Sequence, residues 1–235
     1  MKKYVIGNWK CHKTIDDGLD WFQQFSTSYR KSDRVKVVVA PTFLCLDRLS
    51  VTLDGLQLSD VSLSAQDVSA FPRGNYTGVI AADMLKPLVD YVIIGHAERR
   101  RYCHETVQDV INKVAEAADC GLIPIVCVED SELLSQLRPL ADIECKELIV
   151  AYTPVEVLTF NIPESVDRVT EAVKRINAFF PTWPVVYGGR VSEENAKEYL
   201  AIQGISGLFV GEASLEPEKF ARLCEFAEQS VERKA

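Results

Sequence analysis

Short runs of β-favouring apolar residues alternate along the chain with longer segments in which apolar residues recur every three or four positions. Tyr91–Gly95 is such a run, and His96 and the charged residues Glu98–Arg100 follow it. A short continuous apolar run indicates a strand buried on both faces. The spacing of apolar residues over Glu105–Ala118 indicates an amphipathic helix instead. We therefore expect strands that alternate with helices.

The same two patterns recur along the chain. Strands are predicted at Tyr4–Asn8, Val35–Ala40, within Leu56–Gln66, and at Tyr91–Gly95, Leu122–Val128, Leu148–Tyr152, Pro184–Tyr187 and Gly207–Val210. Helices are predicted after Thr14 as N-cap, at about Phe43–Leu53, Ala81–Leu88, Glu105–Ala118, Glu132–Leu137, Pro163–Phe180, Ser192–Leu200 and Pro217–Val231. Pro163 stands at the start of its helix, where proline is favoured.

The number of strands separates the possible α/β folds, because an open doubly wound sheet usually needs five or six strands. Eight strand–helix pairs, with no linker or low-complexity segment between them, predict a single (β/α)8 barrel domain over residues 1–235. Its fifth helix is shortened, since Pro139 follows the helical pattern of Glu132–Leu137 after less than two turns.

Charge and cysteine content narrow the class of protein. A net charge of -8 argues against nucleic acid or an anionic membrane as a partner. No run of eighteen apolar residues is present, and Gly7, Asn8 and Lys10 interrupt the apolar start, so neither a membrane span nor a signal peptide is expected. Seven cysteines without CxxC spacing indicate free thiols in the cytoplasm and no zinc site.

In a (β/α)8 barrel the chemistry lies at the C-terminal ends of the strands. The polar side chains at these ends are those of Asn8, Lys10, Gln66, His96, Glu98, Glu129, Asp130 and Thr153. Gly188, Gly189, Gly211 and Glu212 follow the last two strands, where open backbone N–H groups at a helix start favour phosphate. Charged groups this close together are costly unless a charged molecule binds there; the alternative is a solvated helix start.

These residues resemble the triosephosphate isomerase family over essentially the whole chain. The matching segments share the family's order and each stands at a strand end: Gly7-Asn8-Trp9-Lys10, Ala65-Gln66, Thr77-Gly78, Gly95-His96-Ala97-Glu98-Arg99-Arg100, Ala151-Tyr152, Pro154-Val155, Tyr187-Gly188-Gly189 and Val210-Gly211. The resemblance implies interconversion of dihydroxyacetone phosphate and glyceraldehyde 3-phosphate, with no cofactor and no metal.

The resemblance also implies a role for each matching side chain. His96 would be the neutral histidine that polarises the substrate carbonyl, as is known for the family. Lys10, placed by Asn8, would neutralise the developing enediolate and the phosphate, and Glu98 would hold Lys10 and shuttle protons. A surface lysine and a structural histidine are the alternative interpretations of Lys10 and His96.

The family's general base is missing. Where the family has Ala-Tyr-Glu-Pro-Val-Trp, this chain has Thr153 after Ala151-Tyr152, and a threonine hydroxyl is too weak a base to remove a carbon-bound proton. Losing a positioned general base costs ~10²–10⁴-fold in rate. The family's glycine-rich lid hinge is replaced by residues 157–161, so closure over a substrate is in question. Glu156 would need a rebuilt loop to serve as the base, and a solvated glutamate is the simpler interpretation.

Further departures affect the phosphate site. Glu129 and Asp130 replace a Gly-Glu pair, Glu212 replaces a glycine, and Arg190 replaces a serine. A carboxylate at Glu212 would repel phosphate if it pointed inward, whereas an outward side chain would leave only its backbone N–H near the ligand.

The loop Asp67–Gly78 suggests a partner. In the family this loop inserts into a second subunit, where its threonine, here Thr77, supports the neighbour's site. A homodimer is therefore expected; on a monomer Phe71 and Tyr76 would be left exposed.

Three functions remain open from the sequence. The chain is either an isomerase of this family, with weak or absent activity, or a non-catalytic relative that binds a phosphorylated metabolite or a protein partner. A third possibility is another phosphate-processing chemistry that uses Lys10 and His96, for example through a Schiff base. A neighbouring Glu98 argues against it, because it would raise the pKa of Lys10.

Overall fold

Eight parallel strands close into a barrel in the computed structural model, which describes residues 2–130, 133–160 and 162–232. Within these ranges, the side chains of residues 54, 156, 158, 159 and 232 lie outside the description. The strands are β1 (Lys3–Asn8), β2 (Val35–Ala40), β3 (Val61–Ala65), β4 (Tyr91–Ile94), β5 (Ile123–Val128), β6 (Ile149–Tyr152), β7 (Val185–Tyr187) and β8 (Gly207–Val210).

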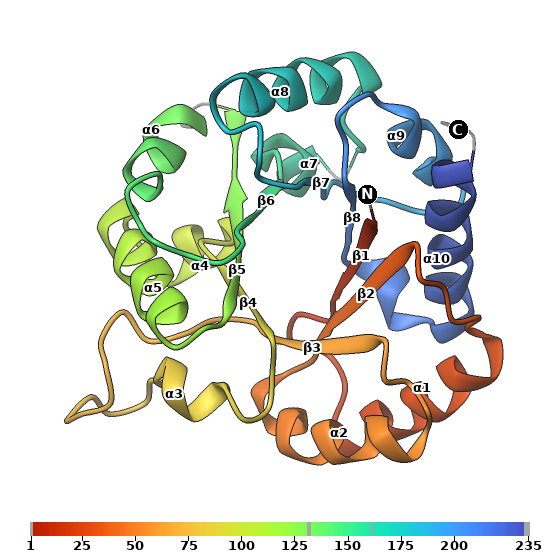
Figure 1. Ribbon diagram of the computed structural model, residues 1–235, viewed down its shortest axis with the longest axis horizontal. Coiled ribbons are helices and arrows are strands. Elements are labelled where there is room, and N and C mark those ends of the chain that lie inside the picture. The colour runs from red at the N-terminus through yellow and green to blue at the C-terminus, as the bar shows by residue number, and fades with distance from the viewer. Residues whose placement is uncertain (1, 131–132, 161, 233–235) are drawn as a thin grey trace.

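Closure of the barrel depends on the pairing of β8 with β1, from Tyr4 opposite Gly207 to Gly7 opposite Val210. A Cβ atom on Gly207 would lie 1.9 Å from the carbonyl oxygen of Tyr4, so only glycine fits at this first pair. Figure 1 shows the strands as a central ring with the helices around it. The predicted (β/α)8 barrel is confirmed.

The helices lie on the outside of this ring. They are α1 (Ile15–Ser28), α2 (Phe43–Gly55), α3 (Ala82–Leu85), α4 (Ala97–Tyr102), α5 (Val107–Asp119), α6 (Leu133–Leu137), α7 (Val155–Phe160), α8 (Val166–Phe179), α9 (Ala196–Ala201) and α10 (Pro217–Glu232), with 3-10 turns η2 (Arg138–Leu140) and η3 (Glu212–Leu215). In the described part of the chain, none of them is both long and apolar enough to cross a membrane.

The shortened fifth helix is confirmed as α6, which has five residues. The chain does not break at Pro139 but continues as the 3-10 turn η2, which tolerates a proline near its start. Residues 131 and 132, part of the predicted helix, lie outside the described residues.

Two predicted helix starts are wrong. α8 begins at Val166 and not at Pro163, because the hydroxyl of Ser165 accepts a hydrogen bond from the Arg168 N–H and caps the helix there. α9 begins at Ala196 and not at Ser192, because the side-chain oxygen of Asn195 accepts from the Ser192 N–H and holds a turn before the helix.

The strands alternate between two cores. Val5, Val37 and Val39 face the helices, whereas Ile6 and Val38, next to them in sequence, face the barrel interior. This period of two is expected for β-strands with both faces buried. The outer core includes an aromatic group under α1 and α10, formed by Trp9, Trp21, Phe22, Phe25 and Phe220.

Candidate active site

Lys10 stands two residues beyond β1 in a strained backbone conformation. Its φ is 52°, in the left-handed region that costs a residue with a side chain on the order of 1 kcal/mol or more. The Asn8 side chain accepts a hydrogen bond from the Lys10 N–H at 3.0 Å. The Gln66 amide donates to the carbonyl oxygens of Lys10 and Ala40, both at 2.9 Å. Hydrogen bonds with the end of β1 and with Gln66 after β3 thus fix where the lysine side chain starts.

The ammonium of Lys10 meets the carboxylate of Glu98, which follows a different strand. Lys10 Nζ lies 2.5 Å from Glu98 Oε1, although the two residues are 88 positions apart in sequence. About a third of each side chain is exposed, so the pair borders solvent at the rim of the barrel. The structure therefore brings together two of the residues that the sequence singled out.

His96 is the N-cap of α4 and is buried, with 7% of its surface exposed. Its Nδ1 accepts a hydrogen bond from the Glu98 N–H at 3.2 Å, which requires a lone pair on that nitrogen. Burial lowers the pKa of His96 from 6.5 to about 4, and the charge of Glu98 only partly opposes the shift. The ring is therefore neutral at physiological pH, with its proton on Nε2, and acts as a hydrogen-bond donor there.

Thr153 follows β6 and is also buried. Its N–H donates to the Val128 carbonyl at 2.8 Å, and its hydroxyl oxygen lies 3.4 Å from the same carbonyl oxygen. The hydroxyl donates its proton to this carbonyl, and its oxygen is in any case too weakly basic to take a proton from carbon. The Glu156 side chain, the other candidate base, lies outside the described residues.

A short helix, α7, occupies most of the segment in which the family's lid hinge was expected. Pro154 is followed by α7. Beyond it, both the backbone N–H and the backbone carbonyl of Glu164 make hydrogen bonds. The Tyr187 hydroxyl accepts from the Glu164 N–H at 3.1 Å, and the Tyr199 hydroxyl donates to the Glu164 carbonyl at 2.5 Å. Residue 161 of the expected lid lies outside the described residues.

The candidate phosphate site departs from expectation at one glycine. The N–H of Gly188 donates to the Tyr152 carbonyl at 2.9 Å, so the prediction that it stays open for a ligand is wrong; the glycine is close enough to β6 to extend the sheet pairing. Gly189 cannot carry a side chain, because a Cβ there would lie 2.2 Å from the Tyr187 hydroxyl oxygen. Gly211 lies next to Lys10, whose Cε would be 3.7 Å from a Cβ on the glycine.

Glu212 is an exposed residue directly after β8 and Gly211. Its side chain is 83% exposed, and its carboxylate pairs with Arg190 at 3.7 Å. An exposed pair of opposite charge adds little net field at the rim. Arg190 therefore partly offsets the negative charge of Glu212, and the placement of this carboxylate relative to a ligand stays a prediction.

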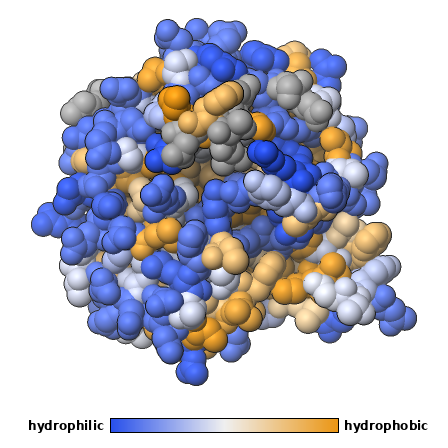
Figure 2. Space-filling model, turned by 180° about the vertical axis from the view of Figure 1, so that it is seen from behind, coloured by the Kyte–Doolittle hydropathy of each residue, from blue (hydrophilic) through white to orange (hydrophobic). Residues whose placement is uncertain are grey.

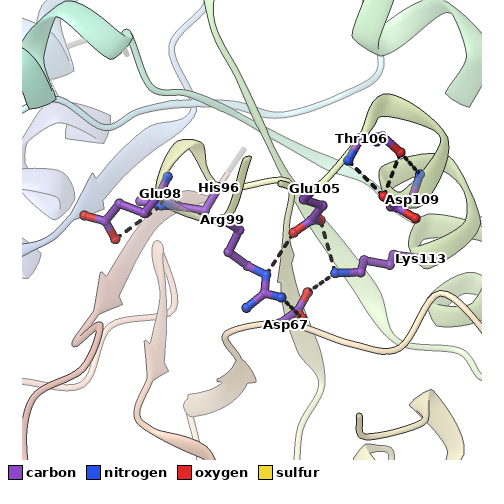
Figure 3. A network of polar contacts seen from close by, with 8 residues as sticks. All are labelled: Asp67, His96, Glu98, Arg99, Glu105, Thr106, Asp109 and Lys113. Atoms are coloured by element: carbon purple, nitrogen blue, oxygen red, sulfur yellow. Dashed lines mark hydrogen bonds and ion pairs between the residues drawn. The ribbon is translucent and has the colours of Figure 1, made fainter. Parts of the chain in front are cut away.

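A ring of four charges holds α4 in place and was missed from the sequence (Figure 3). Arg99 pairs with Asp67 at 2.7 Å and with Glu105 at 2.8 Å, and Lys113 pairs with the same two carboxylates at 2.7 and 3.2 Å. The side chain of Glu105 is only 3% exposed and that of Lys113 only 8%. The one available signal was a lysine on the apolar face of Glu105–Ala118.

The loop after β3 projects from the barrel (Figure 1). Phe71 and Tyr76 stack with ring centroids 4.7 Å apart, and both are close to half exposed. Thr77 lies in the same loop and is exposed. Figure 2 shows hydrophobic residues gathered on this side of the molecule.

The described residues offer no group of three or more histidine, cysteine or acidic side chains placed to hold a metal ion. What they do offer is an ammonium, a carboxylate and a neutral imidazole at one rim. An imidazole N–H and an ammonium can polarise a carbonyl and stabilise the negative charge that develops on its oxygen. A side chain able to remove a carbon-bound proton does not stand at position 153.

The closed barrel and the polar groups at its C-terminal rim define a protein of the (β/α)8-barrel class. A family model described as triosephosphate isomerase matches residues 3–227. A triosephosphate isomerase of Dehalococcoides mccartyi is 33% identical, with 95% of this chain and 96% of that protein covered. One of Gloeobacter violaceus is 35% identical, with 96% and 98% covered. This chain belongs to the triosephosphate isomerase family.

A solved structure is similar over nearly the whole fold. The triosephosphate isomerase of Bartonella henselae superposes with a TM-score of 0.83 at 26% identity, with 97% of this chain and 100% of that chain covered. In this family a neutral histidine is the known electrophile, and the neutral state of His96 agrees with that arrangement.

Proposed function

We propose that this chain is a triosephosphate isomerase-like protein that binds dihydroxyacetone phosphate or glyceraldehyde 3-phosphate at the C-terminal rim. It interconverts them through an enediolate at a rate strongly reduced by Thr153. No metal or cofactor takes part. The observation that carries the proposal is the neutral, buried His96 beside the Lys10–Glu98 pair.

His96 and Lys10 support one half of the isomerase chemistry, which is stabilisation of the enediolate. The Nε2–H of His96 donates to the substrate carbonyl oxygen, and the charge of Lys10 stabilises the enediolate and the phosphate. The other half needs a base for the carbon-bound proton, and position 153 supplies none. Asn8 places Lys10, and backbone at Gly188, Gly189, Gly211 and Glu212 lines the phosphate side, with the N–H of Gly188 already used within the sheet.

The alternative is a non-catalytic relative that binds a phosphorylated metabolite or a protein partner. The direction of the Thr153 hydroxyl toward a backbone carbonyl favours this alternative, because the residue then serves the barrel and not a ligand. Both functions share the proposed homodimer through Asp67–Gly78 and a cytoplasmic location, which agrees with seven free cysteines.

Two measurements decide between these functions. Calorimetry with 2-phosphoglycolate, which carries a phosphate and a planar anionic carboxylate, tests binding. We expect binding by the wild type and a loss of about 10²-fold in affinity for Lys10→Ala, because a charge-assisted contact is removed. Lys146→Ala, an exposed lysine before β6 at the opposite end of the barrel, is the control and keeps full affinity.

An isomerase assay then tests turnover. Conversion above the buffer rate that disappears in His96→Ala supports the isomerase. Binding with conversion at the buffer rate supports the non-catalytic alternative. Absence of 2-phosphoglycolate binding by the wild type contradicts the proposed phosphate site.

A further inference from the structure

Phe209 fills the upper interior of the barrel directly below the candidate site. It lies in β8, is 5% exposed, and belongs to the hydrophobic cluster inside the barrel. Its ring centroid is 6.1 Å from that of His96, which follows β4 on the other side of the barrel. The phenyl ring therefore reaches across the barrel toward the imidazole.

The same ring packs against the end of β7. A Cβ atom on Gly188 would lie 2.8 Å from Phe209 Cδ1 and 3.0 Å from Thr153 Cγ2. Contacts this close leave no room for a side chain, so Gly188 is pressed between the two residues. Residues after β6, after β7 and in β8 thus form one packed layer that extends to His96.

This layer restricts what position 153 can hold. The hydroxyl branch of Thr153 is directed at the Val128 carbonyl oxygen, 3.4 Å away, and the methyl branch is directed at Gly188. A longer acidic side chain that followed the hydroxyl branch would meet a carbonyl oxygen of like partial charge. One that followed the methyl branch would meet Gly188 and the Phe209 ring.

We propose that Phe209 is a positioning residue of this site, acting through position 153. Its ring is the apolar floor between His96 and position 153, and it keeps a carboxylate at position 153 from reaching the carbon next to a carbonyl held by His96. The inference rests on the proposed function, since it assumes that a triose phosphate binds at this rim.

The chemistry that the floor blocks is a proton transfer. If a carboxylate at position 153 had room to reach the substrate, its oxygen would take the proton from the carbon next to the carbonyl. The electron pair left on carbon forms the carbon–carbon double bond of the enediolate, and the carbonyl oxygen takes the negative charge opposite His96 and Lys10. The proton of the adjacent hydroxyl passes to this oxygen, the adjacent carbon becomes the new carbonyl, and the carboxylic acid returns its proton to the former carbonyl carbon. A displacement of about 1 Å in such an arrangement costs on the order of 10²-fold in rate.

The test is a set of four proteins: wild type, Thr153→Glu, Phe209→Leu and the double variant. Isomerase kcat and KM are measured for each, together with 2-phosphoglycolate affinity and thermal stability. We expect little gain in kcat from either single change and a gain of at least about tenfold over Thr153→Glu in the double variant. Because the gain comes from proton transfer, it falls on kcat and not on KM.

Two further variants distinguish a specific effect of Phe209 from a general loosening of the barrel interior. Ile125→Val, in the same interior cluster, combined with Thr153→Glu should give no such gain. Phe209→Met replaces Phe209→Leu if the leucine variant does not fold. A double variant no faster than Thr153→Glu, with 2-phosphoglycolate still bound, overturns the role of Phe209. Failure of the wild type to bind 2-phosphoglycolate overturns the proposed function itself.

Discussion

His96 shows how one buried side chain ties the site to the stability of the protein. Burial lowers its pKa to about 4 in the folded chain, below the ordinary value of 6.5. Between these two pH values the unfolded chain binds more protons than the folded one. The stability associated with a neutral His96 is therefore complete above pH 6.5 and is lost as the pH falls toward 4.

We expect this residue to account for roughly 3 kcal/mol of the decrease in unfolding free energy between pH 7 and pH 4. Urea unfolding at a series of pH values measures the decrease, and His96→Gln should make it smaller by about that amount. His12→Gln, which changes an exposed side chain, is the control and should keep the wild-type pH dependence. Equal pH dependence in wild type and His96→Gln would contradict the neutral buried imidazole.

At the scale of elements, the position of α4 depends on charges from three other segments. The ring of Asp67, Arg99, Glu105 and Lys113 joins α4 to the start of the β3 loop, to the link before α5 and to α5 itself. α4 has six residues and carries Glu98, while His96 caps it, so a shift of this helix moves two groups of the candidate site. A helix this short has little stability of its own, and its tertiary contacts decide where it lies.

Removing Lys113 from this ring leaves Arg99 as the single cation for two largely buried carboxylates, so that one negative charge is uncompensated. Lys113→Met should therefore lower the unfolding free energy by about 3–5 kcal/mol, as measured in urea. Lys174→Met changes an exposed lysine on α8, and its effect should stay within about 0.5 kcal/mol. Similar effects for both variants would show that the ring contributes no more than a surface pair.

At the scale of the whole molecule, the projecting loop is the least self-contained part. Phe71, Tyr76 and Val79 are each 45–51% exposed, and the two aromatic rings stack on each other and not on the barrel. A patch of exposed apolar side chains on one loop is typical of an interface, which must bury on the order of 1,000 Å² in total to be stable.

A double change of Phe71→Asp and Tyr76→Asp should convert a dimer of this chain into a monomer, because it buries two carboxylates at the interface. Sedimentation velocity at micromolar concentration measures the mass. Tyr102→Asp, at a 69% exposed tyrosine on α4, is the matched control and should stay dimeric. A wild type that sediments as a monomer rules out the proposed dimer.

The sequence by itself determined the barrel and most of its strands. Runs such as Val35–Ala40 and Gly207–Val210 match β2 and β8 residue for residue, since apolar runs and glycines act locally. It also placed Thr153 where the family has its general base, which stays a prediction. The helices α4 and α7 were not predicted from the sequence. Both are short helices that follow a strand, and their residues show no clear helical period of apolar positions.

Only the tertiary structure decided how the site is assembled and charged. The contact of Lys10 with Glu98 joins residues far apart in sequence, and so does the contact of Glu212 with Arg190 from another loop. The neutral state of His96 follows from burial, which is a property of the packed molecule. Hydrogen bonding, burial and charge pairing across strands depend on distances in space, and a pattern along the chain does not contain those distances.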